Sequence, residues 1–167
     1  MRKLLFIVCM AMFSIGTFAQ VKGDKAVGAN LTYGEDSKTF AVGVKGQYNL
    51  TDAIRLEAAA DYWLKKDGVF WWDVQANAHY LFNLSDKLKI YPIAGIGYMG
   101  YKTDAVEVST GYVTVKSESS TGGDVFFNLG GGVQYDLTEK LFLSGEVKYQ
   151  FKDEGQIAVS AGIGIKF

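Results

Sequence analysis

One nine-residue pattern occurs three times in this chain and limits what the chain can fold into. It consists of an aromatic residue, Asn or Asp, Leu, Thr or Ser, an acidic residue, a variable residue, and two aliphatic residues one position apart. The copies lie at residues 48–56, 82–90 and 135–143. In each copy the alternation of apolar and polar residues breaks over a few polar positions and then resumes, which is typical of a tight hairpin turn. Three such turns predict pairs of strands joined in an up-and-down sheet.

The first residues form a unit of their own. Met1 to Lys3 is basic, residues 4–13 are apolar, and Ala19 ends a cleavage site of small residues. The apolar stretch is too short to span a bilayer as a helix, so we expect residues 1–19 to be a cleaved secretory signal peptide and residues 20–167 to form one barrel domain. A lipoprotein signal at Cys9 fits less well, because Cys9 lies inside the apolar stretch. Cys9 is the only cysteine, so the mature chain would have none.

Alternation with period two continues through the rest of the chain and divides it into eight segments of roughly ten residues, the length of a tilted membrane-spanning strand. Each segment has an apolar face and an opposite face of glycine, polar and charged residues. The frequent glycine and aromatic residues and the single proline also favour strands and turns over helices. The predicted strands are 26–33, 40–50, 54–64, 72–82, 88–101, 127–135, 141–151 and 157–167.

Two barrels are compatible with this pattern. A soluble, lipocalin-like carrier would turn the apolar face inward, whereas an outer-membrane barrel would turn it toward lipid. Eight glycines on the polar face suit the crowded interior of a narrow barrel, and aromatic residues gather at both ends of the apolar face, as in the girdles of membrane barrels. We therefore predict an all-β fold, an eight-stranded antiparallel up-and-down transmembrane β-barrel in the outer membrane of a Gram-negative bacterium.

Two segments carry a resemblance to a known family. With the signal peptide and the eight strands, residues 91–98 (YPIAGIGY) and 162–167 (GIGIKF) resemble small outer-membrane β-barrel proteins, in particular the outer-membrane protein X type and the barrel domain of the outer-membrane protein A type. In that family the barrel-assembly machinery recognises a last strand that ends in Phe. The resemblance thus implies an assembly role for Phe167. A place in the periplasmic aromatic girdle is the structural alternative.

The polar face carries five basic and five acidic residues. A barrel of eight strands has room inside only for side chains, and an unpaired buried charge is unfavourable by several kcal/mol, so we expect these groups to pair. A narrow channel through the lumen is the alternative. Lys166 and Asp136 share this face, and the predicted lumen ion-pair network consists of Lys45, Arg55, Glu57, Asp61, Asp73, Lys89, Glu146 and Lys148.

Nothing in the sequence favours catalysis. His79 is the only histidine, and it is expected inside the barrel near the tight turns, away from the outer end where a substrate would arrive. One histidine and no mature cysteine argue against a transition-metal site. Residues 95–100 match the G-x-G-x-x-G fingerprint but lie within a strand, so we expect no dinucleotide cofactor. The chain has no basic patch that would bind nucleic acid.

The long connection between the fifth and sixth strands is the segment most open to a functional role. Valine alternates with polar residues on both sides of a short turn, which predicts a hairpin that extends beyond the membrane. An exposed strand edge can bind a partner strand, so we expect either an adhesion-like contact with a protein or glycan or a purely structural hairpin on a monomeric envelope protein. The hairpin residues are Val106, Val108, Tyr112, Val113 and Val115.

Overall fold

The computed structural model describes residues 22–66, 69–103, 107–109, 114–116, 121–153 and 155–167, so the expected signal peptide lies outside the described residues. Among the described residues there is no helix long and apolar enough to cross a membrane. The strands are β1 (Lys25–Gly34), β2 (Thr39–Asn49), β3 (Ile54–Lys66), β4 (Val69–Tyr80), β5 (Phe82–Asn83), β6 (Leu88–Thr103), β7 (Glu107–Ser109), β8 (Thr114–Lys116), β9 (Thr121–Asp136), β10 (Leu141–Phe151) and β11 (Gln156–Lys166).

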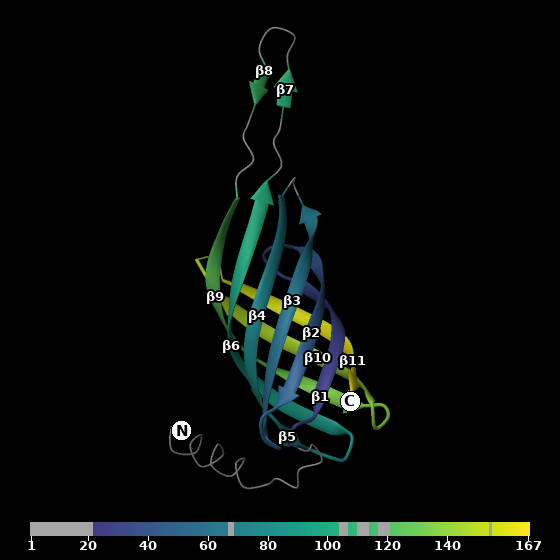
Figure 1. The fold of residues 1–167 in the computed structure, drawn as a ribbon. Helices are drawn as coiled ribbons and strands as arrows, with labels where there is room; N and C mark the ends of the chain where they lie inside the picture. Colours follow the sequence, from purple (N-terminus) through teal and green to yellow (C-terminus); the bar gives the residue numbers. More distant parts are fainter. Residues whose placement is uncertain (1–21, 67–68, 104–106, 110–113, 117–120, 154) are drawn as a thin grey trace.

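The main sheet closes on itself (Figure 1). Its strand order is β4-β3-β2-β1-β11-β10-β9-β6-β5, and β4 also pairs with β6, which completes the ring. Every pair is antiparallel, and β1 pairs with β11, so the first and last strands meet along the wall. The predicted eight-stranded antiparallel barrel is therefore confirmed, with β5 as a short continuation of β4 beyond Leu81. Leu81 lies between the two strands, and its backbone N–H donates to Ala53 O at 2.7 Å.

The three repeated sequence patterns form three turns with the same hydrogen bonds. In each turn the hydroxyl oxygen of Thr51, Ser85 or Thr138 accepts hydrogen bonds from the backbone N–H groups two and three residues further along the chain. The distance to the second of these donors is 2.9 Å at Thr51, 3.1 Å at Ser85 and 2.9 Å at Thr138. A short hydroxyl side chain is thus the local reason why the pattern recurs, since it satisfies N–H groups that no strand partner reaches.

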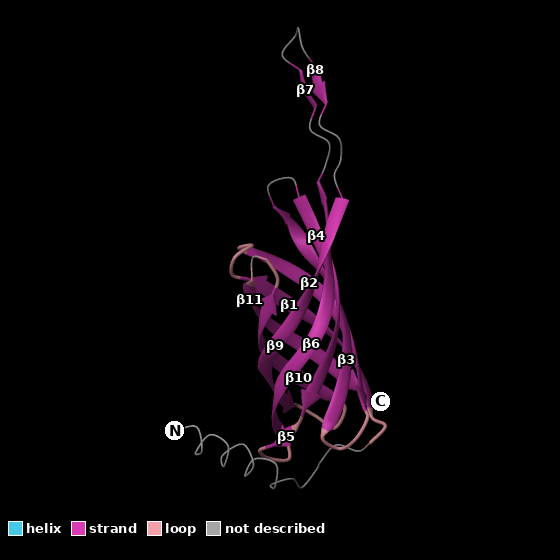
Figure 2. Cartoon of the chain, turned by 90° about the vertical axis from the view of Figure 1, so that its left-hand side faces the viewer, coloured by secondary structure: helices cyan, strands magenta, loops and turns pink. Residues whose placement is uncertain are grey.

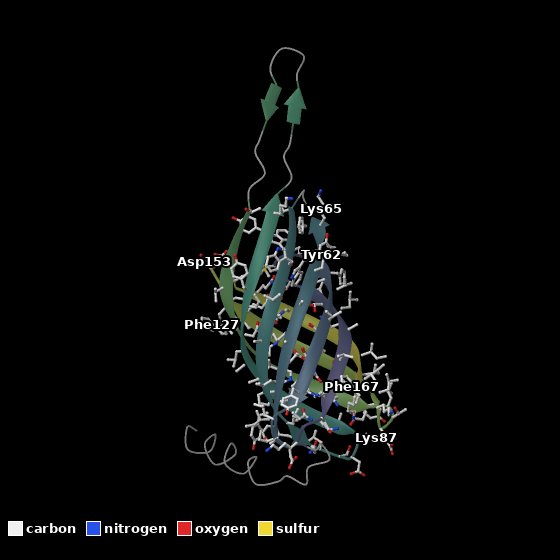
Figure 3. All side chains as sticks on the ribbon, in the orientation of Figure 1. Tyr62, Lys65, Lys87, Phe127, Asp153 and Phe167 are labelled. Carbon is white, nitrogen blue, oxygen red and sulfur yellow. The ribbon has the colours of Figure 1, made fainter. Side chains whose placement is uncertain are left out.

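The two faces of the barrel wall differ as the alternation predicts. Aliphatic and aromatic side chains point outward, and the side chain of Val44 at the middle of β2 is 64% exposed. Figure 3 shows Tyr62, Phe127 and Phe167 pointing away from the barrel, with Lys65 and Lys87 at opposite ends. Polar and charged side chains fill the interior, where Arg55 is 1% exposed. A barrel with an apolar exterior and a polar core has the surface of a protein that is solvated by lipid.

β7 and β8 form a separate two-stranded sheet at the end where β6 finishes and β9 begins (Figure 2). In this pair Val108 lies opposite Val115. Val106, Tyr112 and Val113 of the predicted hairpin lie outside the described residues. β6 and β9 have 16 residues each, and β9 begins at Thr121 rather than near Phe127 as predicted.

Candidate functional site: the barrel interior

The centre of the lumen holds a group of charged side chains from strands on opposite sides of the barrel. Lys45 Nζ on β2 lies 2.7 Å from Glu146 Oε1 on β10 and 3.5 Å from Glu57 Oε2 on β3. The Tyr91 hydroxyl donates to the same Glu146 oxygen at 3.0 Å, and Lys148 Nζ is 3.8 Å from Oε2. Because β1 and β11 separate β2 from β10 in the sheet, the Lys45–Glu146 contact crosses the lumen.

A second group surrounds Arg55, closer to the tight turns. Its Nε donates to His79 Nδ1 at 3.2 Å, its Nη1 donates to Gln134 Oε1 at 2.6 Å, and the guanidinium lies 4.7 Å from the centre of the Tyr91 ring. The His79 ring stacks on Tyr91 with a centroid distance of 4.8 Å, and His79 Nε2 is 3.7 Å from Glu57 Oε1. His79 is 1% exposed, so its ring is enclosed by side chains and has no room for a substrate.

A third group closes the lumen at the tight-turn end. Asp136 accepts hydrogen bonds from Lys89 Nζ at 2.5 Å and from Gln134 Nε2 at 2.8 Å, and its carboxylate is 2.8 Å from Lys166 Nζ. These contacts join β6, β9 and β11. Together with the Arg55 group they fill this end of the barrel with paired polar side chains.

A fourth group, around Asp61 and Asp73, lies toward the opposite end. The two aspartates face each other across β3 and β4, and the Gln75 side-chain amide donates to both, at 3.0 and 2.7 Å. Asn30 donates to Asp61 at 2.6 Å and the Trp63 indole N–H donates to Asp73 at 2.6 Å. Donors from neutral side chains therefore solvate two carboxylates that would otherwise repel each other at close range.

All eight residues of the predicted network are buried inside the barrel, but they do not form one set of ion pairs. Lys89 pairs with Asp136, outside the predicted set, and Arg55, Asp61 and Asp73 bond instead to amide, imidazole or indole side chains. The central charged group contains the other four, Lys45, Glu57, Glu146 and Lys148.

Aromatic side chains complete the interior, and two of them were not predicted. Phe126 lies over Gly97 and Phe142 over Gly164, each glycine being directly opposite its aromatic partner on the neighbouring strand. Tyr91 lies over Gly132 in the same way. Extending the alternation backward from the inward residue 128 would have placed Phe126 inside. The position of Phe142 between two outward leucines carries the same signal.

This combination of a closed antiparallel barrel, an apolar outer wall and an interior of buried polar and charged side chains defines an integral outer-membrane β-barrel protein. Sequence comparison agrees. The chain belongs to the outer membrane protein beta-barrel domain family, whose profile matches residues 5–167. Its location is the Gram-negative outer membrane, and the alternative of a soluble carrier is therefore wrong.

Individual relatives support the same assignment. Outer membrane protein X of Escherichia coli K12 is 28% identical over 152 residues, which cover 89% of this chain and 79% of that protein. The N-terminal β-barrel domain of Pseudomonas aeruginosa OprF aligns with a TM-score of 0.69 at 19% identity, covering 89% of this chain and all of that one. Ail of Yersinia pestis aligns with a TM-score of 0.58 at 13% identity, covering 88% of this chain and all of that one. At these identities the two structures show a shared fold alone.

Proposed function

We propose that this protein is a non-catalytic scaffold of the outer membrane that presents the β7–β8 hairpin for an adhesion-like contact with a partner protein or glycan. The observation that carries the proposal is the separate β7–β8 sheet. Among the described residues these two strands pair only with each other, so each has a free edge of backbone donors and acceptors. Such an edge can pair with an extended strand of a partner, and the hairpin lies at the end opposite the short turns, which in these barrels face the periplasm.

A protein of the same fold supports this role. Ail of Yersinia pestis is the attachment invasion locus protein, and it has been crystallised with the heparin analogue sucrose octasulfate. A protein named for attachment, and one that binds a heparin analogue, is therefore found among barrels of this fold.

Adhesion to cultured epithelial cells tests the proposal. Cells expressing the wild type would be compared with cells expressing a variant in which residues 107–116 are replaced by a Gly-Ser linker. A matched control replaces residues 152–155, the connection after β10 at the same end, with Gly-Ser. We expect the hairpin variant alone to lose adherence severalfold at equal surface amounts. Equal adherence of wild type and hairpin variant would overturn the proposal.

The interior contacts support a filled barrel over the alternative of a narrow channel. Lys45, Glu146 and Tyr91 meet at the centre of the lumen at hydrogen-bonding distances, where hydrated ions would have to pass. Planar-bilayer recordings of the purified protein should therefore show no stable openings. Reproducible unitary conductance from the wild type would favour the channel instead.

We also propose that Phe167 is recognised by the barrel-assembly machinery and that the protein is a monomer. The Phe167 side chain faces outward and is 71% exposed, and its backbone bonds to Lys25 at the seam where β1 meets β11. The closed ring leaves no barrel edge for a second copy to pair with. Phe167→Ala should lower the yield of folded protein in the outer membrane, whereas Phe151→Ala, an outward aromatic at the other end, should not. Equal yields would contradict the assembly role.

A further inference from the structure

A small cavity lies at the outer mouth of the barrel, above the Asp61–Asp73 group. Its volume is about 210 Å³. The side chains that line it come from the β1–β2 connection, β3, β4, β6, the segment after β10 and the start of β11, so they converge on the mouth from around the ring. They include Asp36, Trp63, Trp71, Met99, Lys152 and Gln156.

Two indole rings form the apolar part of this cavity. Trp63 and Trp71 lie directly opposite each other on β3 and β4. Trp63 is 2% exposed and fixed in place, because its indole N–H donates to Asp73 and its ring occupies the space beside Gly34, where a Cβ would lie 2.9 Å from the ring. Trp71 is half-buried and also lines the cavity. The cavity thus has a rigid aromatic wall and a second, partly accessible aromatic surface.

Asp36 and Lys152 are the charged side chains among the described residues that line the cavity. Asp36 belongs to the connection between β1 and β2, and Lys152 follows β10 and reaches toward Met99, with Nζ 3.7 Å from the sulfur. Gln156 is buried and donates to Gln150 at 2.6 Å, which holds its side chain at the edge of the cavity. Among the described residues that line the cavity, the rim therefore includes one acidic and one basic side chain beside the Gln156 amide.

We propose that this cavity binds a single neutral pyranose ring, as found at the end of a glycan or polysaccharide chain. Indole rings stack on the apolar C–H face of a pyranose, while its hydroxyls need both donors and acceptors around them. The volume is below the roughly 300–1,000 Å³ of sites for drug-sized ligands, which suits one ring rather than a chain. The filled interior closes the cavity from below, so the sugar is held at the surface and not transported.

The experiment uses the full-length protein folded in a zwitterionic or amine-oxide micelle, because glycoside detergents would compete. Methyl pyranosides of glucose, galactose, mannose and N-acetylglucosamine are titrated while tryptophan fluorescence is recorded. The chain has three tryptophans. Trp63 and Trp71 line the cavity, and Trp72 lies on the opposite face of β4, 41% exposed on the outer wall. At least one pyranoside should give a saturable change with a Kd on the order of 1 mM.

Matched variants decide where the signal arises. Trp71→Leu should raise the Kd about tenfold or more, because it removes the stacking surface. Trp72→Phe should leave binding unchanged. Asp36→Asn, which changes a side chain in a connection and not in the wall, should weaken binding while heat-modifiable gel mobility shows that the barrel is folded.

Three results would overturn the proposal. One is the absence of a saturable change with all four pyranosides, and another is unchanged binding in the Trp71→Leu variant. The third is saturation by choline or by inorganic sulfate in place of the sugars, which would assign the cavity to another class of ligand. The proposal does not depend on the hairpin, and the variant with residues 107–116 replaced should bind the sugar as the wild type does.

Discussion

Lys45 and Glu146 lie 101 positions apart in the sequence and on strands that do not touch, yet their side chains meet inside the barrel at 2.7 Å. The contact joins one wall of the lumen to the other. It is also the point at which Tyr91, Glu57 and Lys148 converge. Because the groups are buried, the stability of the barrel should depend on their mutual compensation.

Glu146→Ala should destabilise the folded barrel by about 3–5 kcal/mol, because it leaves Lys45 and Lys148 without their shared partner in a desolvated site. Urea unfolding in lipid vesicles measures the difference. The double variant Lys45→Met with Glu146→Met removes both charges of the pair and should be less destabilised than Glu146→Ala alone. If the double variant loses at least as much stability as Glu146→Ala, the pairing of buried charges does not account for the contribution of these residues to the free energy of unfolding.

Gly97→Ala should destabilise the barrel by about 1–3 kcal/mol, because a Cβ on Gly97 would collide with the Phe126 ring. Gly46→Ala is the matched control. Gly46 lies on the outer face and a Cβ there meets nothing within 4 Å, so this change should be close to neutral. The same unfolding measurement applies to both variants.

Gly97 and Phe126 can also be tested for direct energetic coupling. In a Phe126→Leu background, Gly97→Ala should be less harmful than in the wild type, because the smaller side chain leaves room for the added methyl group. Equal effects in the two backgrounds would mean that Phe126 is not what requires glycine at this position.

The strands and faces could be predicted from the sequence because they depend on local alternation. Trp72 and Asp73 of the predicted strand 72–82 show this, since adjacent residues of one strand must point to opposite faces, and Trp72 is exposed whereas Asp73 is buried. The turns could also be predicted, because Thr51, Ser85 and Thr138 act on their own neighbours in the chain. Each of these features is contained within a few consecutive residues.

The contacts inside the barrel could not be predicted in the same way, because they depend on register and on distances across the lumen. Alternation places Lys45 and Glu146 inside, but not within reach of each other. It gives no means of telling that Asp61 is bonded by Asn30 and Gln75 rather than by a lysine. The pairing of Phe126 with Gly97 likewise requires the register between β6 and β9.

Thr138→Val should destabilise the barrel by about 1 kcal/mol, because it keeps the shape of the side chain but removes the oxygen that accepts two backbone N–H groups. Thr138→Ser should be nearly neutral, since Ser85 plays the same part in the second turn. Thermal unfolding in micelles is sensitive enough to rank the two variants. A Ser variant as unstable as the Val variant would show that the hydroxyl is not the stabilising group.

The side of the barrel wall that faces lipid can be determined most directly from the neighbouring residues Trp71 and Trp72. One variant keeps only Trp72 (Trp63→Phe, Trp71→Phe) and the other keeps only Trp71 (Trp63→Phe, Trp72→Phe). Both are reconstituted in vesicles whose acyl chains carry bromine, which quenches tryptophan on contact. Trp72 fluorescence should be strongly quenched and Trp71 fluorescence much less so. Quenching of Trp71 with Trp72 unaffected would contradict the outward apolar face and the polar interior derived from it.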